Sequence, residues 1–306
     1  MALETTMGGI TALVGNTPLV SIHLFDELNP DLRVYAKLEW FNPGGSVKDR
    51  AALAMIEDGE RRGALRPGRT IVDSTSGNTG VAYAMVGAAK GYPVELVMPA
   101  NASRERKELV LAYGAKAVYT DPMEGSDGAI RRVREMVARD ADRYFYPDQY
   151  NNPANPQAHR LGTAQEILRQ APSPVTHFVA GVGTTGTFVG TATGLKEHDR
   201  SITAIAVQPE AAFHGLEGLK HLLTAIVPGI WRPEVADHVW GAPTEPAYAL
   251  ARRLAREEGL LAGHSSGAAL WAIERLARQG VRGTAVTVFP DGGDRYLSTG
   301  LYQVKA

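Results

Sequence analysis

Apolar and polar positions follow two rhythms along the chain, one typical of strands and one typical of helices. Residues 34–39 alternate as a strand does, and the apolar residues after Lys48 recur at helical spacing. Further strands are predicted at 70–73, 93–98, 115–119, 175–179, 202–207 and 285–289, and helices at 81–90, 103–113 (capped by Ser103), 128–139 and 269–278. Strands that alternate with helices across short loops predict parallel sheets covered by helices, which is an α/β fold.

Two segments interrupt this order. Residues 146–156 are rich in proline and asparagine, and we interpret them as the passage between an N-terminal α/β domain, residues 1–150, and a C-terminal one, residues 151–306. We allow that the first ~35 residues cross over to the sheet of the other domain. Residues 210–240 show only a weak pattern, which is typical of a lid or a substrate loop.

Composition excludes several classes of protein. A formal net charge of -1 gives no reason to expect nucleic acid or an anionic membrane as a partner. The absence of cysteine excludes disulfides, thiolate catalysis and cysteine-ligated zinc. Residues 1–16 lack the pattern of a signal peptide, and no apolar run approaches a membrane span, so we expect a cytoplasmic protein.

A lysine stands at the junction between a predicted strand and a predicted helix. The stretch 42–50 reads Asn-Pro-Gly-Gly-Ser-Val-Lys-Asp-Arg, so a proline and two glycines shape the loop before Lys48. The positive end of a helix disfavours protonation of an amine, and a neutral amine is what Schiff-base chemistry needs. Taken alone, the stretch fits a solvated lysine in a surface charge cluster better than a catalytic one.

Three further loops have the same place in the pattern, after a strand and before a helix. They are rich in glycine, serine and threonine and cover residues 74–80, 181–187 and 262–269. Such loops surround a small anion with N–H and O–H donors, although each alone is also compatible with an ordinary helix cap. Because ligands of open α/β sheets bind at the carboxyl ends of parallel strands, the three loops and Lys48 predict one shared site.

The loop at 181–187 leaves a second ligand open. Residues 181–186 fit the pattern G-x-G-x-x-G, and Glu210 ends the next strand at about the distance expected of a ribose-binding acid. A dinucleotide site is therefore an alternative. The threonines between the glycines favour instead a cup of donors for a single phosphate monoester.

Together these motifs resemble one family. The stretch 42–50, the loops 75–80, 183–187 and 263–267, and their order along the chain look like cysteine synthase, also called O-acetylserine sulfhydrylase. The runs 183–187 and 294–300 are most similar to the B type of that family. The resemblance implies the tryptophan synthase β-like fold of the type II pyridoxal-phosphate (PLP) enzymes, in which two three-layer α/β domains with mostly parallel sheets enclose the active site in the cleft between them.

The resemblance implies a role for each matching residue. Lys48 would be the catalytic residue and would carry pyridoxal 5′-phosphate as a Schiff base. Asn78 would bond the 3-hydroxyl of the cofactor, and Ser265 would face its pyridine nitrogen. The cofactor phosphate would be held by Gly183, Thr184, Thr185, Gly186 and Thr187. The substrate α-carboxylate would be bound by Thr75, Ser76, Thr79 and Gln149.

The reaction implied is a β-replacement on an amino acid. The substrate would displace Lys48 from the cofactor, and the freed amine would remove the α-proton. Loss of the β-substituent would give α-aminoacrylate, to which a sulfur nucleophile adds. A hydroxyl beside the ring nitrogen, at Ser265, makes a weaker electron sink than a carboxylate would, which favours β-elimination over transamination. The product would be L-cysteine, or S-sulfocysteine, from O-acetylserine or O-phosphoserine with sulfide or thiosulfate.

Some residues depart from the family pattern and leave the substrate pair open. His264 stands where an apolar residue or glycine is usual, and residues 162–167 replace a Thr-Thr-Gly-Pro-Glu-Ile run. Lys220 aligns with a B-type stretch that carries two basic residues. With His221, it would favour an anionic co-substrate, although a solvated surface lysine is an equal interpretation.

Alternatives from other classes remain. Within the same fold, a cystathionine β-synthase or a serine/threonine dehydratase would use the same cofactor. A nicotinamide-dependent oxidoreductase would use residues 181–186, and a silent binding protein would use the fold alone. We expect a homodimer that binds an amino-acid substrate and a sulfur donor, with no metal, nucleic acid or membrane partner.

Overall fold

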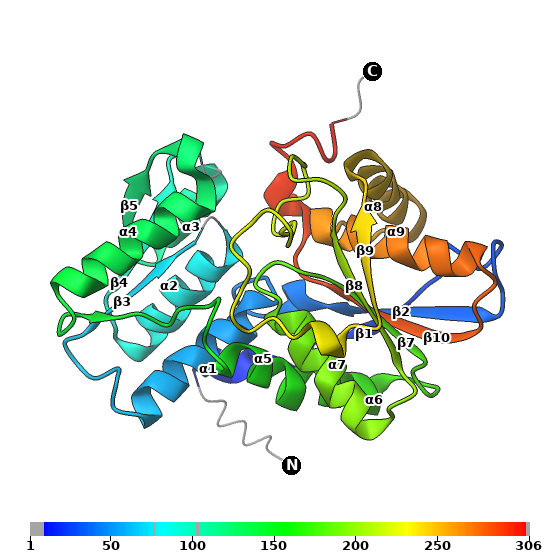
Figure 1. Ribbon diagram of the computed structural model, residues 1–306, viewed down its shortest axis with the longest axis horizontal. Coiled ribbons are helices and arrows are strands. Elements are labelled where there is room, and N and C mark those ends of the chain that lie inside the picture. The colour runs from blue at the N-terminus through cyan, green and yellow to red at the C-terminus, as the bar shows by residue number, and fades with distance from the viewer. Residues whose placement is uncertain (1–8, 76, 102–103, 304–306) are drawn as a thin grey trace, which may run out of the picture. The chain divides into compact units, whose positions relative to one another are not determined.

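The computed structural model describes residues 9–75, 77–101 and 104–303 (Figure 1). The chain forms two compact units. The first contains the chain up to Asn16, then Asn42–Gly44 and Lys48–Asp148; the second contains Thr17–Phe41, Gly45–Val47 and the chain from Gln149 onward. The chain therefore passes between the units several times within the first 48 residues and once more inside the segment 146–156.

The first unit is built on a parallel sheet of four strands in the order β5-β4-β3-β6 (Figure 1). Its strands are β3 (Thr70–Ser74), β4 (Val94–Pro99), β5 (Lys116–Thr120) and β6 (Tyr144–Phe145), and its helices are α1 (Lys48–Arg61), α2 (Asn78–Lys90), α3 (Arg104–Ala112) and α4 (Gly125–Arg139). Val97 packs into a core with α4, while its neighbour Leu96 lies under Gly80 of α2. Because successive side chains of a strand point to opposite faces, α2 and α4 cover opposite faces of this sheet.

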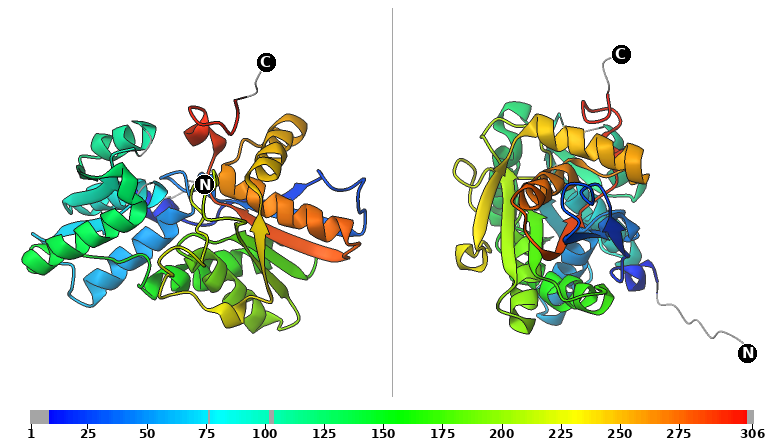
Figure 2. Two further views of the ribbon diagram at one scale, coloured as in Figure 1. Left: turned by 45° about the horizontal axis from the view of Figure 1, so that its top comes forward. Right: turned by 90° about the vertical axis from the view of Figure 1, so that its right-hand side faces the viewer.

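The second unit is built on six strands in the order β1-β2-β10-β7-β8-β9, of which only β1 runs antiparallel to its neighbour. The strands are β1 (Leu19–Ile22), β2 (Leu32–Leu38), β7 (His177–Gly181), β8 (Thr203–Pro209), β9 (His238–Ala242) and β10 (Gly283–Phe289). The helices are α5 (Ala154–Ala158), α6 (Ala164–Gln170), α7 (Gly186–His198), α8 (Thr244–Glu258) and α9 (His264–Arg278). Helices α8 and α9 share one core with this sheet and α6 and α7 share the other, which gives three layers (Figure 2).

The predicted α/β fold with mostly parallel sheets is confirmed, and the strands lie within a few residues of the predicted ranges. The helices α2 and α9 begin earlier than predicted, because residues of the glycine loops form their first turns. Strand β9 was missed inside the segment expected to be irregular. The predicted cap Ser103 lies outside the described residues.

The division of the chain differs from the domains expected at 1–150 and 151–306. Residues 17–41 belong to the second unit, so the crossing allowed for the first ~35 residues extends to Phe41. The reason is packing: β2 pairs in parallel with β10, and Val34, Ala36 and Leu38 enter the core of the second unit. The later break falls between Asp148 and Gln149. None of the helices that the structure describes is long and apolar enough to cross a membrane.

Candidate functional site

Lys48 is the first residue of α1 and lies at the predicted strand–loop–helix junction, half-buried. Asp49, which is fully buried, accepts a 2.5 Å hydrogen bond from the Gly44 N–H through Oδ2. A Cβ on Gly44 would lie 2.5 Å from the Asp49 carboxylate, so the loop needs glycine there. Gly45 has φ +78°, a backbone conformation that side chains disfavour. The two glycines and the buried aspartate thus fix the turn that leads into Lys48.

The loop between β3 and α2 is organised by one threonine. The hydroxyl oxygen of Thr75 accepts hydrogen bonds from the Gly77 N–H at 3.2 Å and from the Gly80 N–H at 3.0 Å. Asn78 and Thr79 form the first turn of α2, with Thr79 buried and Asn78 half-buried. Ser76 lies outside the described residues. The loop is therefore compact, with its side chains gathered at the start of a helix.

A buried carboxylate anchors the strand that precedes this loop. Asp73 is fully buried at the end of β3 and accepts hydrogen bonds from the Ser74 N–H at 2.7 Å and the Tyr83 hydroxyl at 2.8 Å. Burial, and the adjacent Asp73 charge, raise the pKa of Tyr83 well above its usual value. The tyrosine therefore remains a hydrogen-bond donor, and it ties α2 to β3 next to Thr75.

The loop between β7 and α7 carries the clearest sign of a ligand. Thr185 adopts φ +73°, a strained conformation for a β-branched residue, immediately before α7. Its side chain is 2% exposed, and its Oγ1 has no hydrogen-bond partner among the described residues. A buried hydroxyl without a partner is unfavourable unless a ligand supplies one. The N–H groups at the start of the 13-residue helix α7 favour an anion there.

Two glycines let the chain close tightly around this loop. A Cβ on Gly183 would lie 2.2 Å from the carbonyl oxygen of Gly218, and one on Gly186 would lie 2.0 Å from Oδ1 of Asn155. Asn155 is buried and donates through Nδ2 to Thr184 Oγ1 at 3.3 Å and to the Gln149 carbonyl at 2.8 Å. Asn155 was missed by sequence reasoning, although it lies in the asparagine-rich segment that was singled out there.

Ser265 belongs to the first turn of α9 and is 8% exposed. Its hydroxyl donates to the Glu217 carbonyl at 3.3 Å, and the next residue, Gly218, packs on Gly183. The irregular segment after β8 therefore joins Ser265 to the loop before α7 within the second unit. Nothing in the pattern of residues 210–240 predicted this contact, because main-chain carbonyls carry it.

Lys220 follows in the same segment. Its N–H donates to the Val182 carbonyl at 2.9 Å, and its Nζ lies 4.9 Å from the centroid of the Tyr150 ring. His221 bonds Thr224 through Nδ1 at 2.8 Å. Lys220 thus lies next to the residues that lead into the loop before α7, and it is half-buried rather than fully solvated.

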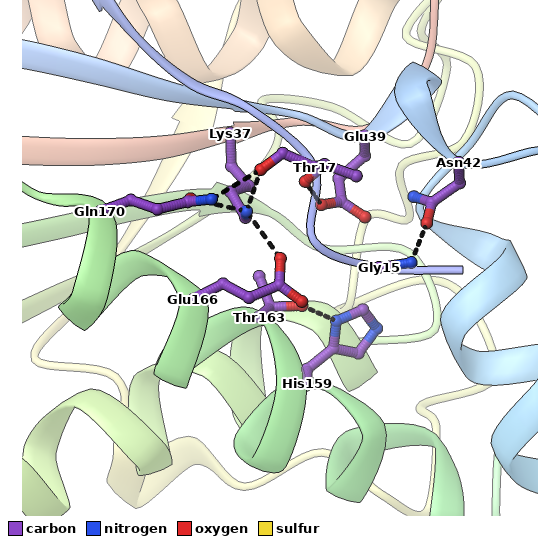
Figure 3. A network of polar contacts seen from close by, with 9 residues as sticks. All are labelled: Gly15, Thr17, Lys37, Glu39, Asn42, His159, Thr163, Glu166 and Gln170. Atoms are coloured by element: carbon purple, nitrogen blue, oxygen red, sulfur yellow. Dashed lines mark hydrogen bonds and ion pairs between the residues drawn. The ribbon is translucent and has the colours of Figure 1, made fainter. Parts of the chain in front are cut away.

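A second buried lysine in the chain is committed to a different network (Figure 3). Lys37 in β2 is fully buried and pairs with Glu166 at 2.6 Å. Its Nζ also donates to the Thr17 carbonyl at 2.5 Å and to Gln170 Oε1 at 2.8 Å. A charged lysine held by a carboxylate and two further acceptors is not available as a nucleophile. Lys37 is therefore structural, and Lys48 remains the candidate.

The comparisons with known proteins agree with this geometry. Residues 10–291 match the family model described as pyridoxal-phosphate dependent enzyme. The chain belongs to this family. Its cofactor is pyridoxal 5′-phosphate, as predicted. The loop before α7 fits the phosphate of that cofactor, because it offers the N-terminus of a helix and the Thr185 hydroxyl, which has no partner within the described ranges.

Related proteins narrow the resemblance. A cysteine synthase of Aquifex aeolicus is 53% identical over 302 residues, which is 97% of this chain and 92% of that protein. The cysteine synthase B of Escherichia coli is 40% identical over 97% of this chain and 96% of that protein. The crystal structure of a cysteine synthase from Entamoeba histolytica has a TM-score of 0.92 and 36% identity, covering 100% of this chain and 94% of that one. The predicted resemblance and the type II fold are confirmed, and the nicotinamide alternative is not favoured.

Proposed function

We propose that this protein makes L-cysteine by replacing the β-substituent of an O-activated serine with sulfide, or makes S-sulfocysteine when thiosulfate is the nucleophile. The activated serine is O-acetylserine or O-phosphoserine. The names of the related proteins support the reaction class. The observation that carries the proposal is the strained Thr185 at the start of α7, whose Oγ1 has no hydrogen-bond partner among the described residues, because a bound phosphate ester would explain both features.

In the proposed reaction, each of these residues has its own role. Pyridoxal phosphate, when bound, withdraws electrons from the substrate Cα and so makes its proton and β-substituent easier to lose. Lys48 Nζ holds the cofactor and removes the proton from the substrate Cα. Asn78 donates to the 3-hydroxyl of the cofactor, and Ser265 faces its ring nitrogen. The phosphate is held by Gly183, Thr184, Thr185, Gly186 and Thr187, and the substrate carboxylate by Thr75, Ser76, Thr79 and Gln149.

The substrate pair is tested by a panel of amino acids and nucleophiles. O-acetylserine, O-phosphoserine and serine are each combined with sulfide, with thiosulfate and with homocysteine, and both the released group and the amino-acid product are measured. We expect cysteine from at least one O-activated serine and none from serine. Turnover of serine with homocysteine would indicate a cystathionine β-synthase, and pyruvate with ammonia would indicate a dehydratase.

Ser265→Asp is expected to lower the rate of cysteine formation and to raise transamination. A carboxylate beside the ring nitrogen would hold that nitrogen protonated and strengthen the electron sink, which favours proton return to the cofactor over loss of the β-substituent. The measurement is the ratio of cysteine to pyridoxamine phosphate formed per turnover.

Ser21→Asp is the control. Ser21 is an exposed serine of β1 whose hydroxyl lies 3.0 Å from His23 Nε2, so this change adds a carboxylate without altering the loops of the site. The product ratio of this variant should equal that of the wild type. A wild-type ratio of cysteine to pyridoxamine phosphate in Ser265→Asp would show that Ser265 does not lie beside the ring nitrogen of the cofactor.

Lys220→Ala is expected to weaken the use of an anionic co-substrate, whether O-phosphoserine or thiosulfate. A hydrogen bond to a charged group contributes about 1.5 kcal/mol at the lower end of its range, so the KM for the anion should rise about tenfold. The KM for O-acetylserine, with sulfide as nucleophile, should stay within about twofold. Added salt should reproduce the effect in the wild type, since Lys220 is partly exposed.

Lys107→Ala provides the control, because Lys107 also lies over a tyrosine ring, with its Nζ 5.1 Å from the Tyr119 centroid. Its loss should change neither KM. If Lys220→Ala raises the KM equally for both substrate pairs, or for neither, then Lys220 is a surface lysine that does not contact the co-substrate.

We further infer that the protein is a cytoplasmic homodimer. Its lack of cysteine means that no disulfide is needed for stability, in keeping with a reducing compartment. Light scattering tests the assembly: the expected mass is twice the 32.8 kDa of one chain, and a mass of one chain would contradict it.

A further inference from the structure

The loop that follows β10, residues 290–296, holds two segments of chain at once. The Val47 N–H donates to the Pro290 carbonyl at 2.8 Å, and Ser46 forms an antiparallel bridge with Asp291. On the other side, the Gly263 N–H donates to the Asp291 carbonyl at 3.1 Å. The segment ending directly before Lys48 and the segment ending two residues before Ser265 therefore both make main-chain contacts with Asp291.

The side chain of Asp291 strengthens this junction. Asp291 is 2% exposed, and its Oδ2 accepts a 2.5 Å hydrogen bond from the Tyr296 hydroxyl. A Cβ on Gly263 would lie 2.1 Å from Oδ1 of Asp291, so the carboxylate rests directly on the backbone before α9. Burying a carboxylate is unfavourable unless it is hydrogen-bonded. The hydrogen bond from Tyr296 offsets part of that cost and ties the two residues together.

Tyr296 extends the junction to α9 itself. Its ring is 2% exposed and meets the ring of His264 edge-on, with centroids 4.3 Å apart at 81°. His264 is 1% exposed and immediately precedes Ser265. Edge-to-face aromatic pairs have a defined geometry, so the position of Tyr296 constrains the first turn of α9. The Asp291–Tyr296 hydrogen bond in turn sets the position of that ring.

The next side chain supports the other segment. The guanidinium of Arg295 lies against Gly45, where a Cβ would come within 2.3 Å of Nη2. Gly45, with φ +78°, stands three residues before Lys48. The loop 290–296 thus contacts Gly45, in the loop before Lys48, through Arg295. It contacts His264, in the first turn of α9, through Tyr296.

We propose that Asp291 and Tyr296 are positioning residues that set the directions in which the chain enters Lys48 and Ser265. The inference rests on the proposed function, which places those two side chains on the cofactor. The hydrogen bond between Tyr296 and Asp291 keeps the His264 ring, and with it the first turn of α9, in a fixed relation to the backbone that pairs with Ser46 and Val47. Neither residue touches a reacting atom in this account.

Tyr296→Phe and Asp291→Asn test the proposal. The first removes one hydroxyl and keeps the ring on His264; the second keeps the size and one acceptor oxygen. A misplacement of about 1 Å can lower a rate by about 10²-fold, so we expect kcat to fall about 10- to 100-fold. The KM for the amino acid should change less than about twofold, because Thr75, Asn78 and Thr79 lie outside this junction. The double variant should be no worse than the worse single variant, since both act on one hydrogen bond, which Tyr296→Phe removes and Asp291→Asn reduces to a bond with a neutral amide.

Two readouts do not depend on turnover. The circular dichroism of bound pyridoxal phosphate in the visible range reports how its ring is held, and borohydride reduction followed by peptide mass analysis reports its attachment to Lys48. Both should change in each variant while the phosphate loop still retains the cofactor. Should the wild type make no cysteine, the proposed function fails, and these two readouts still decide the positioning role.

Tyr144→Phe is the matched control, because the Tyr144 hydroxyl also donates to a carboxylate, Glu95, at 3.0 Å. Tyr144 lies in β6, which pairs with the start of β3 rather than with the end that leads to Thr75. We expect a similar fall in Tm and an unchanged kcat. If Tyr296→Phe behaves like this control, with kcat and the visible circular dichroism of the wild type, the proposal is overturned. If Asp291→Asn does not fold, Tyr296→Phe alone decides the question.

Discussion

Replacement of Lys48 by alanine is expected to abolish cysteine formation and covalent attachment of the cofactor. Removal of a positioned proton-transfer group alone lowers a rate by about 10²- to 10⁴-fold, and Lys48 would also lose its covalent link to pyridoxal phosphate. No substitute is at hand in β2, because Lys37 is held by Glu166 and Gln170. The measurement is cysteine formed per active site, together with borohydride trapping of the cofactor on a lysine peptide.

Lys90→Ala is the control for this prediction. Lys90 ends α2 and pairs with Glu60 at 2.8 Å, so its loss removes a lysine without touching the loop before Lys48. This variant should form cysteine at the wild-type rate and should trap the cofactor on a lysine peptide to the wild-type extent. If the Lys48→Ala protein still traps the cofactor on a lysine to the wild-type extent, then Lys48 is not the attachment residue.

Gly186→Ala is expected to lower the affinity for pyridoxal phosphate. The new Cβ would lie 2.0 Å from Oδ1 of Asn155, a buried side chain that bonds Thr184 and the Gln149 carbonyl. Overpacking a buried site costs about 1–3 kcal/mol, which corresponds to about 5- to 150-fold in Kd. Cofactor titration, followed by fluorescence, gives this Kd directly.

Gly300→Ala separates the steric effect from a general effect of replacing glycine. Among the described residues, apart from the two chain neighbours of Gly300, no atom lies within 4 Å of a Cβ there, so the affinity of this variant for the cofactor should equal that of the wild type. A wild-type Kd in Gly186→Ala, with the protein folded, would contradict the placement of the phosphate at the start of α7.

Local features of this fold were predictable from the sequence because they depend on local chemistry. The loops before α1, α2, α7 and α9 are recognisable in the sequence because glycines and short polar side chains follow apolar runs there. The assignment of β2 to the second unit was not predictable in this way. Alternation shows that one face of a strand is buried, and it does not show which sheet supplies the partner strand.

The candidate site likewise has features that the sequence predicts and features that only the folded chain shows. Lys48 and the residues 183–187 could be singled out as candidates because their residue types and spacing suit the chemistry. The left-handed conformation of Thr185 could not, because threonine disfavours it and only the folded loop imposes it. The contacts of Glu217 with Ser265 and of Asp291 with Tyr296 were also not predicted. These residues act through main-chain carbonyls or through a tyrosine five residues away, and neither contact has a sequence pattern.

The central claim is that the chain exchanges a β-substituent for sulfur. The measurement that tests it most directly follows acetate and L-cysteine together when the wild-type protein, loaded with pyridoxal phosphate, is given O-acetylserine and sulfide. We predict equal amounts of the two products, formed at equal rates and dependent on Lys48; if O-phosphoserine is the preferred substrate, the same equality holds for phosphate and cysteine. Release of acetate or phosphate with pyruvate in place of cysteine, or no release from either amino acid, would contradict the account.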